Sequence, residues 1–235
     1  MGEQRRKLGI IGGMGPEATV YFMHRVIELT PATRDQDHID MLVSNHVSIP
    51  DRSAFIRGQA SESPLEDLLA DARMLAEQGC EVLAIPCNTS HVFYDTIAQA
   101  VDAQVLNIVD ESLAACKARG AQKVGVLATW GTLITDIYGS RAKELGVACQ
   151  YPRPTIQEAV NEAIYDYVKA GKPVPDEMLV GFYDGMAAMG CDAVVLGCTE
   201  LSVAHAALSG EVRAAYPFVV DSLEALAAAC VRECA

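Results

Sequence analysis

The chain repeats one short pattern in its two halves, and this repeat limits the fold more than any other feature. Residues 79–89 read GCEVLAIPCNT, and residues 190–200 read GCDAVVLGCTE, 111 positions later. The first apolar segments also correspond, with LGIIGGMG at 8–15 and VGVLATWG at 124–131. A repeat of this length indicates two similar domains in tandem, because each half is long enough to form its own core.

Each half alternates short apolar runs with amphipathic segments. The apolar runs are typical of strands in parallel sheets that are covered on both faces. The predicted strands are Lys7–Ile11, Met41–Ser44, Val82–Ile85, Val105–Ile108, Val124–Ala128, Ala148–Tyr151, Ala193–Leu196 and Phe218–Val220. The predicted helices between them include Glu17–Glu28, Pro64–Gln78, Ile156–Lys169 and Asp176–Met189. This alternation predicts the α/β class, here as two pseudo-symmetric parallel-sheet α/β domains.

The repeat also predicts the domain boundaries. The first domain is expected to comprise residues 1–109 and, after a second domain at 110–215, residues 216–235. Apolar residues in this last segment recur at helical spacing, which predicts a helix over Asp221–Cys234 that packs on the first half.

The composition excludes several classes of function. The 235 residues include 18 Lys and Arg and 31 Asp and Glu, so the formal net charge is −13. A chain this acidic is not expected to bind nucleic acid or an anionic membrane. No apolar run reaches the ~18–20 residues that a membrane span needs. The run that follows Arg5, Arg6 and Lys7 is short and rich in glycine, which favours a first strand over a signal peptide and predicts a cytoplasmic protein.

Two of the eight cysteines follow directly on predicted strands. Cys87 follows VLAIP and Cys198 follows AVVLG, and both precede polar residues. Parallel α/β sheets bind ligands beyond the carboxyl ends of their strands, where both thiols are expected. Cys80 and Cys191 precede the strands and are expected to be buried apolar residues. Equivalent positions in similar halves predict that Cys87 and Cys198 face each other across an interdomain cleft that forms the active site.

Two opposed thiols can invert a stereocentre. One, as the thiolate, removes a proton from carbon, and the other, as the thiol, returns a proton to the opposite face. A redox pair and a metal site are the competing uses of paired cysteines. A redox pair usually has C-x-x-C spacing, and zinc takes further Cys or His ligands at short spacing. Neither C-x-x-C nor H-E-x-x-H occurs in the chain, so no metal is predicted.

The glycine-rich turn at 9–15 is a weak signal for phosphate binding. It is not G-x-G-x-x-G, and no Walker Gly-Lys-Ser/Thr sequence follows it. The corresponding turn of the second half, Ala128–Thr132, is polar, and its hydroxyl groups suit a carboxylate better than a dinucleotide.

Five motifs are spread over nearly the whole chain. They are Gly12-Gly13-Met14-Gly15-Pro16, Ile49-Pro50-Asp51-Arg52, Pro86-Cys87-Asn88-Thr89-Ser90-His91, Leu127-Ala128-Thr129-x-Gly131-Thr132 and Gly197-Cys198-Thr199-Glu200. Together they resemble the cofactor-independent aspartate/glutamate racemases, most closely the aspartate racemase branch. The resemblance implies an active site between two α/β domains, a C-terminal helix that returns to the first domain, a homodimer and no pyridoxal phosphate or other cofactor.

The resemblance also implies roles for individual residues. Cys87 would deprotonate the D-isomer of the substrate, and Cys198 the L-isomer. The predicted substrate-binding residues are Met14, Asn45, Arg52, Asn88, Thr89, Thr129, Thr132, Tyr165, Lys169, Thr199 and Glu200. Among them, Arg52 and Lys169 would receive the side-chain carboxylate of the amino acid. Glutamate racemases carry His where Glu200 stands, so aspartate is the expected substrate and glutamate a second one.

Several alternatives stay open at this point. Arg52 could be a surface arginine, Lys169 a cation at the negative end of a helix, and His91 a helix residue with no chemical role. Among related enzymes, a maleate isomerase or a hydantoin racemase would also fit, whereas arylmalonate decarboxylases keep one cysteine. A non-catalytic module that holds a small acid is the alternative from a different class. Exchange of the Cα proton with D₂O would distinguish an enzyme from such a module.

Overall fold

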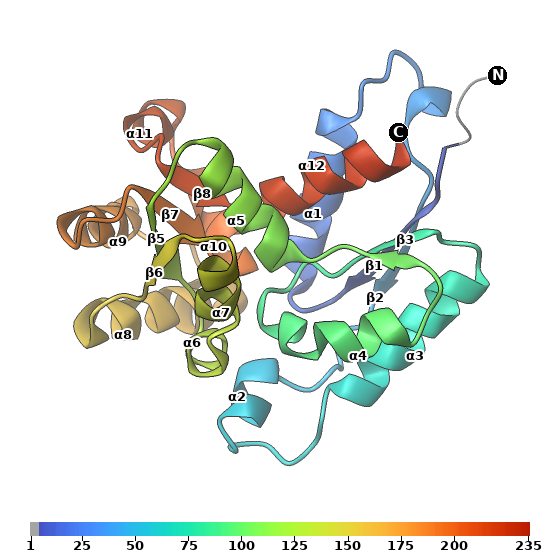
Figure 1. Ribbon diagram of the computed structural model, residues 1–235, viewed down its shortest axis with the longest axis horizontal. Coiled ribbons are helices and arrows are strands. Elements are labelled where there is room, and N and C mark those ends of the chain that lie inside the picture. The colour runs from blue at the N-terminus through green and yellow to red at the C-terminus, as the bar shows by residue number, and fades with distance from the viewer. Residues whose placement is uncertain (1–4) are drawn as a thin grey trace. The chain divides into compact units, whose positions relative to one another are not determined.

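The computed structural model describes residues 5–235, which divide into two units (Figure 1). The first unit runs through Ile108 and includes Leu223–Ala235, and the second comprises Val109–Ser222. Each unit is built on a four-stranded sheet in which all described pairs of strands are parallel. The α/β class and the two parallel sheets predicted from the sequence are therefore confirmed.

The first sheet has the strand order β2-β1-β3-β4. Its strands are β1 (Leu8–Gly12), β2 (Met41–Asn45), β3 (Val82–Ala84) and β4 (Gln104–Val105). The helical segments of this unit are α1 (Pro16–Leu29), η1 (Asp35–Asp37), α2 (Arg52–Ile56), α3 (Leu65–Glu77), η2 (Thr89–Phe93), α4 (Tyr94–Gln99) and α12 (Ser222–Cys234). Figure 1 shows α1 and α12 on one side of this sheet and α3 and α4 on the other.

The inner strand β1 of the first sheet is covered on both of its faces. All five residues of β1 are buried, as expected of a strand whose side chains pack against a layer of helices on each face of the sheet. On the α3 side, Leu68 and Leu75 pack with Ile11 and Leu83 in one continuous core. On the other side, Arg25 of α1 donates two hydrogen bonds to the carboxylate of Glu224 of α12, at 2.5 and 2.8 Å.

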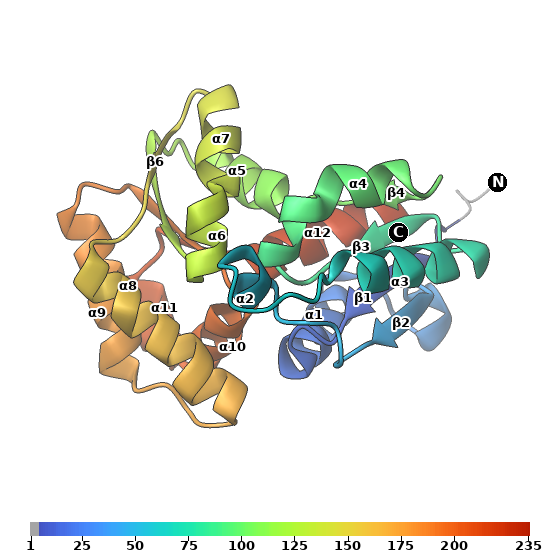
Figure 2. The ribbon, with the colours of Figure 1, turned by 90° about the horizontal axis from the view of Figure 1, so that it is seen from below.

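The returning C-terminal helix predicted from the sequence is present as α12. Its apolar residues Leu223, Leu226, Ala227 and Cys230 are fully buried, at the helical spacing that suggested the helix. Figure 2 shows α12 together with the strands of the first unit.

The second sheet has the strand order β6-β5-β7-β8. Its strands are β5 (Lys123–Leu127), β6 (Ala148–Gln150), β7 (Ala193–Leu196) and β8 (Val219–Asp221). The helical segments of this unit are α5 (Ile108–Ala118), α6 (Trp130–Thr135), α7 (Ile137–Glu144), α8 (Pro154–Glu162), η3 (Ala163–Tyr167), η4 (Val168–Ala170), α9 (Asp176–Ala188), α10 (Thr199–Ala207) and α11 (Gly210–Ala215). Residues 216–222, which the repeat assigned to the first domain, lie in the second unit because β8 hydrogen-bonds to β7.

The two sheets have the same topology. β1 and β5 are the second strands of their sheets, each paired with the strand that precedes the cysteine motif. Cys87 follows β3 and Cys198 follows β7, so the two cysteines occupy corresponding positions in the two sheets.

The strand expected over Val105–Ile108 is shorter than predicted, because β4 ends at Val105 and α5 begins at Ile108. The helix expected over Ile156–Lys169 also differs. α8 ends at Glu162, and a π-helical turn (η3) and a 3₁₀ turn (η4) continue the chain to Ala170. None of the helices between residues 5 and 235 combines the length and the apolar character that a membrane crossing requires.

Candidate functional site

The carboxyl edge of the first sheet holds the first group of predicted site residues. Met14 follows β1, Asn45 ends β2 and Cys87 follows β3, and these strands are direct neighbours. Met14 and Cys87 are buried, whereas Asn45 is exposed. Ser90 donates a hydrogen bond to the sulfur of Met14 at 3.4 Å, which connects the turns after β1 and β3.

The Cys87 turn is fixed by His91. Nδ1 of His91 lies 2.9 Å from the carbonyl oxygen of Cys87, and Nε2 lies 3.2 Å from the backbone nitrogen of Ile108. The Ile108 N–H is a donor, so Nε2 accepts and Nδ1 carries the proton of a neutral imidazole. The structure therefore gives His91 a definite role in positioning the turn. Asn88 and Thr89 lie in the same turn and are buried.

Arg52 is buried, with 7% of its surface exposed, which excludes the interpretation as a surface arginine. It begins the short helix α2, which Asp51 caps by accepting a hydrogen bond from the Ala54 N–H at 2.8 Å. Nη1 of Arg52 donates to the carbonyl oxygens of Ile49 and Pro50 at 3.1 and 2.9 Å. These bonds tie the guanidinium to its own loop.

A His–Asp–Ser group at the end of β2 was not predicted from the sequence. The carboxylate of Asp71, on α3, accepts from Ser44 at 3.0 Å and lies 3.0 Å from Nδ1 of His46. The backbone of His46 also packs against Gly13, where an added Cβ would meet the His46 carbonyl carbon at 2.5 Å. Asp71 and His46 are 25 residues apart, so no local motif indicated this contact.

In the second unit, Thr129 and Thr132 form the turn that corresponds to the glycine-rich turn of the first. Thr129 is the N-cap of α6, where its hydroxyl accepts from the Thr132 N–H at 3.3 Å, and both side chains are buried. Gln157 donates to the carbonyl oxygen of Ala128 at 2.7 Å and holds the same turn from α8.

Cys198 is the N-cap residue of α10 and is hydrogen-bonded to a carboxylate two residues later. Its thiol donates to Oε2 of Glu200 at 3.0 Å, and the hydroxyl of Thr199 donates to the same oxygen at 3.2 Å. The other carboxylate oxygen, Oε1, lies 3.2 Å from Nζ of Lys169. Glu200 is only 4% exposed, and its position in the first turn of α10 is favourable for a negative charge.

The π-helical turn Ala163–Tyr167 carries Tyr165 into this group. Nζ of Lys169 lies 5.3 Å from the centre of the Tyr165 ring, within the range of a cation–π contact. Turns of this kind often occur at functional sites. The sequence predicted both residues for the site, but not the turn that brings them together.

The surroundings of Cys198 disfavour its thiolate. Burial and the nearby charge of Glu200 raise the pKa of the Cys198 thiol well above its ordinary value, and Lys169 opposes them only in part. The pKa of the Cys116 thiol is also raised, to about 12, mainly by burial. A carboxylate that accepts from the thiol distinguishes Cys198 from such a core cysteine.

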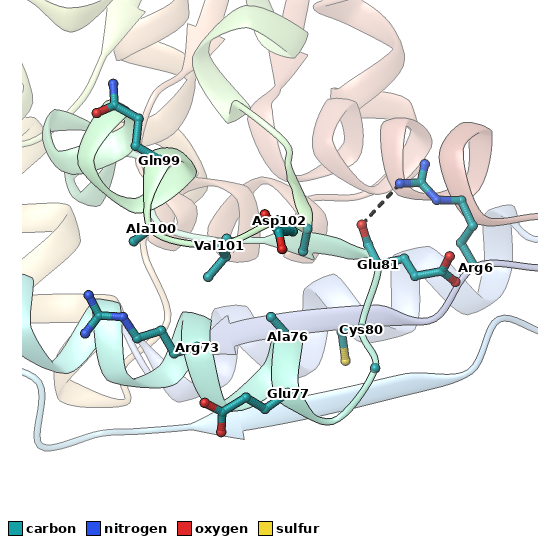
Figure 3. A pocket seen from close by; sticks show the side chains of 12 residues that line it. Arg6, Arg73, Ala76, Glu77, Cys80, Glu81, Gln99, Ala100, Val101 and Asp102 are labelled. Atoms are coloured by element: carbon teal, nitrogen blue, oxygen red, sulfur yellow. Dashed lines mark hydrogen bonds between the residues drawn. The ribbon is translucent and has the colours of Figure 1, made fainter.

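A surface groove of about 650 Å³ lies at the amino ends of β1, β3 and β4 (Figure 3). Arg6, which lines it, donates to the carbonyl oxygen of Glu81 at 3.1 Å. Cys87 follows the opposite, carboxyl end of β3. The groove is therefore not part of the candidate site.

Within residues 5–235, no group of three or more His, Cys, Asp or Glu side chains is arranged to hold a metal ion. The described contacts bring the predicted residues together as two groups, one in each unit. Met14 and Cys87 belong to the first, and Cys198, Glu200 and Lys169 to the second.

Comparison with known proteins identifies the family of the chain. The family model described as Asp/Glu/Hydantoin racemase matches residues 11–230. The chain belongs to the aspartate/glutamate/hydantoin racemase family. The match includes both units and both strand-associated cysteines, so the family resemblance seen in the motifs is confirmed.

Three relatives of the chain are similar over nearly their whole length. A broad specificity amino-acid racemase of Bacillus subtilis, RacX, is 28% identical over 224 residues, which cover 94% of each chain. The solved structure of the Picrophilus torridus aspartate racemase matches with a TM-score of 0.79 and 29% identity, covering 97% of this chain and 93% of the other. An aspartate racemase homologue from Pyrococcus horikoshii matches with a TM-score of 0.76 and 26% identity, covering 97% and 98%.

Proposed function

We propose that the protein is an amino-acid racemase that acts on aspartate, and secondarily on glutamate, with two thiols and without pyridoxal phosphate. The observation that carries the proposal is the placement of Cys87 and Cys198. They follow corresponding strands of two sheets with the same topology, in a chain of this racemase family.

The proposed reaction is a two-base inversion at Cα. In the D-to-L direction the Cys87 thiolate removes the Cα proton, and the Cys198 thiol gives its own proton to the opposite face. In the L-to-D direction the two thiols exchange roles. The proposal requires both thiols to reach one substrate carbon, and turns at the carboxyl ends of parallel strands are suited to presenting them.

The proposed specificity for acidic amino acids rests on Arg52. Its guanidinium is buried at the carboxyl side of the first sheet, where a carboxylate would meet a partly desolvated charge. Asn88, Thr89, Thr129, Thr132 and Thr199 are the proposed partners of the amino acid's α-groups, with Met14 and Asn45 beside them. The relatives named aspartate racemase favour aspartate as the first substrate to test, and the broad specificity relative favours a panel.

Isotope exchange tests the proposal. We expect the enzyme to wash deuterium from D₂O into Cα of L- and D-aspartate, and chiral chromatography to detect conversion of each isomer. Cys87→Ala and Cys198→Ala should each abolish conversion, because inversion needs a base and an acid on opposite faces.

Cys116→Ala is the matched control, because Cys116 is buried and lies in α5, which belongs to neither cysteine motif. It should keep the activity. A wild-type protein that binds aspartate without exchange would be a binding module, and one that acts on maleate or a hydantoin instead would be a different enzyme of the superfamily.

We also propose a cytoplasmic homodimer. Seven of the eight cysteines are buried as free thiols, a usage that suits a reducing compartment. Val20 and Ile27 of α1 are 65% and 42% exposed, and a second copy would cover apolar surface of this kind. Light scattering coupled to gel filtration gives the mass in solution, and a monomer would contradict the dimer.

A further inference from the structure

The carboxylate of Glu200 lies between a thiol and an ammonium group. One oxygen accepts the Cys198 S–H at 3.0 Å, and the other lies 3.2 Å from Nζ of Lys169. Glu200 and Cys198 are both buried, so this arrangement is shielded from bulk water. Glu200 is a poor group for binding a substrate that is itself anionic, because its carboxylate carries the same charge and faces a thiol and an ammonium group of the protein.

We propose that Glu200, anchored by Lys169, keeps the proton on Cys198 in the resting enzyme, so that Cys198 enters the proposed reaction as the proton donor and Cys87 takes the part of the base. This inference rests on the proposed racemase function and deepens it. It changes the role of Glu200 from a substrate ligand to a positioning residue that acts through Cys198. Lys169 is likewise the anchor of Glu200 in the resting enzyme.

The proton balance follows from this resting state. A D-amino acid loses its Cα proton to the Cys87 thiolate, and the carbanion takes the Cys198 proton on its other face. The enzyme is then left with a Cys87 thiol and a Cys198 thiolate. It returns to rest when Cys87 gives one proton to solvent and Cys198 takes one from solvent.

The charged and titratable groups of the second unit around Cys198 come from three elements. Glu200 on α10 disfavours the thiolate, and Lys169 on η4 favours it. Tyr138 on α7 is fully buried, and burial raises its pKa, so it remains a neutral phenol near Cys198. Burial contributes most to raising the pKa of Cys198, and among the charged groups around it Glu200 is the one that favours the protonated thiol.

Alkylation of the full-length wild-type enzyme and variants tests the proposal without measuring activity. Iodoacetamide reacts with the thiolate, and mass spectrometry of the Cys87 and Cys198 peptides gives a rate for each between pH 6 and 10. We expect Cys198 in the wild type to react slowly near neutral pH and faster as the pH rises, because its thiol keeps the proton. Glu200→Gln keeps the size of the side chain and removes its charge, so the rate at Cys198 should rise about tenfold or more at pH 7.5, because one pKa unit is a factor of ten in thiolate.

Lys169→Met gives the opposite expectation. Removing the cation leaves the charge of Glu200 uncompensated, so Cys198 should react several-fold more slowly than in the wild type. Opposite changes distinguish an electrostatic role from loosened packing, which would expose Cys198 and increase its rate in both variants. Glu211→Gln, an exposed residue of α11, is the control and should change neither rate. If Glu200→Gln is poorly folded, Glu200→Asp and Lys169→Met carry the test, and Glu200→Asp should retain a slow Cys198.

The pH dependence of racemisation provides a second readout. The active form needs one thiolate and one thiol, so loss of the Cys198 proton sets the alkaline limb of kcat/KM. Glu200→Gln should move this limb to lower pH. Unchanged Cys198 alkylation in Glu200→Gln, or a change of the same sign in both variants, would overturn the proposal. Failure of the racemase function itself would instead appear as absence of exchange in the wild type, whatever the alkylation pattern.

Discussion

Nδ1 of His91 lies 2.9 Å from the carbonyl oxygen of Cys87, so a neutral imidazole holds the turn that carries one of the two proposed catalytic thiols. The other ring nitrogen accepts the Ile108 N–H at 3.2 Å. The imidazole thus satisfies a buried backbone acceptor and a buried backbone donor at once. The position of Cys87 therefore depends on a side chain with no direct part in proton transfer.

His91→Phe should destabilise the protein and impair racemisation together. The phenyl ring fills the space of the imidazole but leaves the Cys87 carbonyl and the Ile108 N–H without their imidazole partner. The free energy of unfolding should fall by about 1–3 kcal/mol for each buried group. Urea denaturation measures the free energy of unfolding, and kcat for aspartate measures the effect on the turn. His24→Phe is the control, because His24 is exposed on α1 and should change the free energy of unfolding little. A His91→Phe variant of wild-type stability would show that the imidazole does not hold the turn.

Gly13→Ala should be more harmful than Gly79→Ala, although both glycines have positive φ, at 90° and 79°. In both variants the alanine is strained by about 1–2 kcal/mol, because a residue with a Cβ disfavours positive φ. The added Cβ at Gly13 also meets the His46 backbone at 2.5 Å, whereas at Gly79 no described atom lies within 4 Å. We expect Gly13→Ala to lose more stability and, because it shifts the carboxyl edge of the first sheet, most of the activity. Equal losses of stability in the two variants would contradict this close approach.

The sequence was sufficient to predict features that depend on local patterns. Strands such as Ala193–Leu196 are continuous apolar runs that the structure buries on both faces, and the repeat fixed their correspondence between the halves. The cysteine motifs follow from the same repeat, because residues that end equivalent strands occupy equivalent edges.

Other features depend on contacts between distant residues or on small departures from helical geometry. Lys169 and Glu200 are 31 positions apart, and their ion pair forms only when η4 and α10 are packed. The π-helical turn Ala163–Tyr167 differs from an α-helix by about one residue per turn, too little to alter the apolar periodicity of a short segment. The burial of Arg52 is likewise set by the path of its loop rather than by its neighbours in sequence.

Arg52→Ala should selectively lower the kcat/KM for acidic substrates. Loss of a charge-assisted contact to the substrate carboxylate costs about 1.5–3 kcal/mol, which corresponds to roughly 10–150-fold in kcat/KM for aspartate. Alanine never makes that contact, so the rate of its racemisation, measured by chiral chromatography, should hardly change. A general loosening of the Ile49–Pro50 loop would instead lower both rates.

Arg57→Ala is the matched control for Arg52→Ala. Arg57 lies at the C-terminal end of the same short helix but is exposed, so its loss should leave both substrates unaffected. Unchanged turnover of aspartate by Arg52→Ala would remove the basis for proposing an acidic substrate.

His205 should make the protein less stable as the pH falls from about 6.5 to about 4. Its ring lies 3.0 Å from the Tyr183 hydroxyl, and burial, together with the charge of Arg213, lowers its pKa from 6.5 to about 4. In this window the unfolded chain binds a proton that the folded protein does not, so acid favours unfolding. The stabilisation relative to low pH is complete above pH 6.5, and its loss reaches up to about 3 kcal/mol near pH 4.

His205→Gln removes this titration, so urea midpoints measured between pH 4.5 and 7.5 should fall less steeply toward acid than those of the wild type. The variant is expected to be somewhat less stable at pH 7.5, because glutamine does not reproduce the edge-on packing of the imidazole against Tyr183. His24→Gln controls for the loss of an exposed histidine and should keep the wild-type slope. The test compares how steeply the urea midpoint falls with pH, not the absolute stability. A general destabilisation of the second unit would lower all midpoints without changing this slope. Parallel curves for the wild type and His205→Gln would mean that His205 binds its proton equally well in the folded and unfolded states.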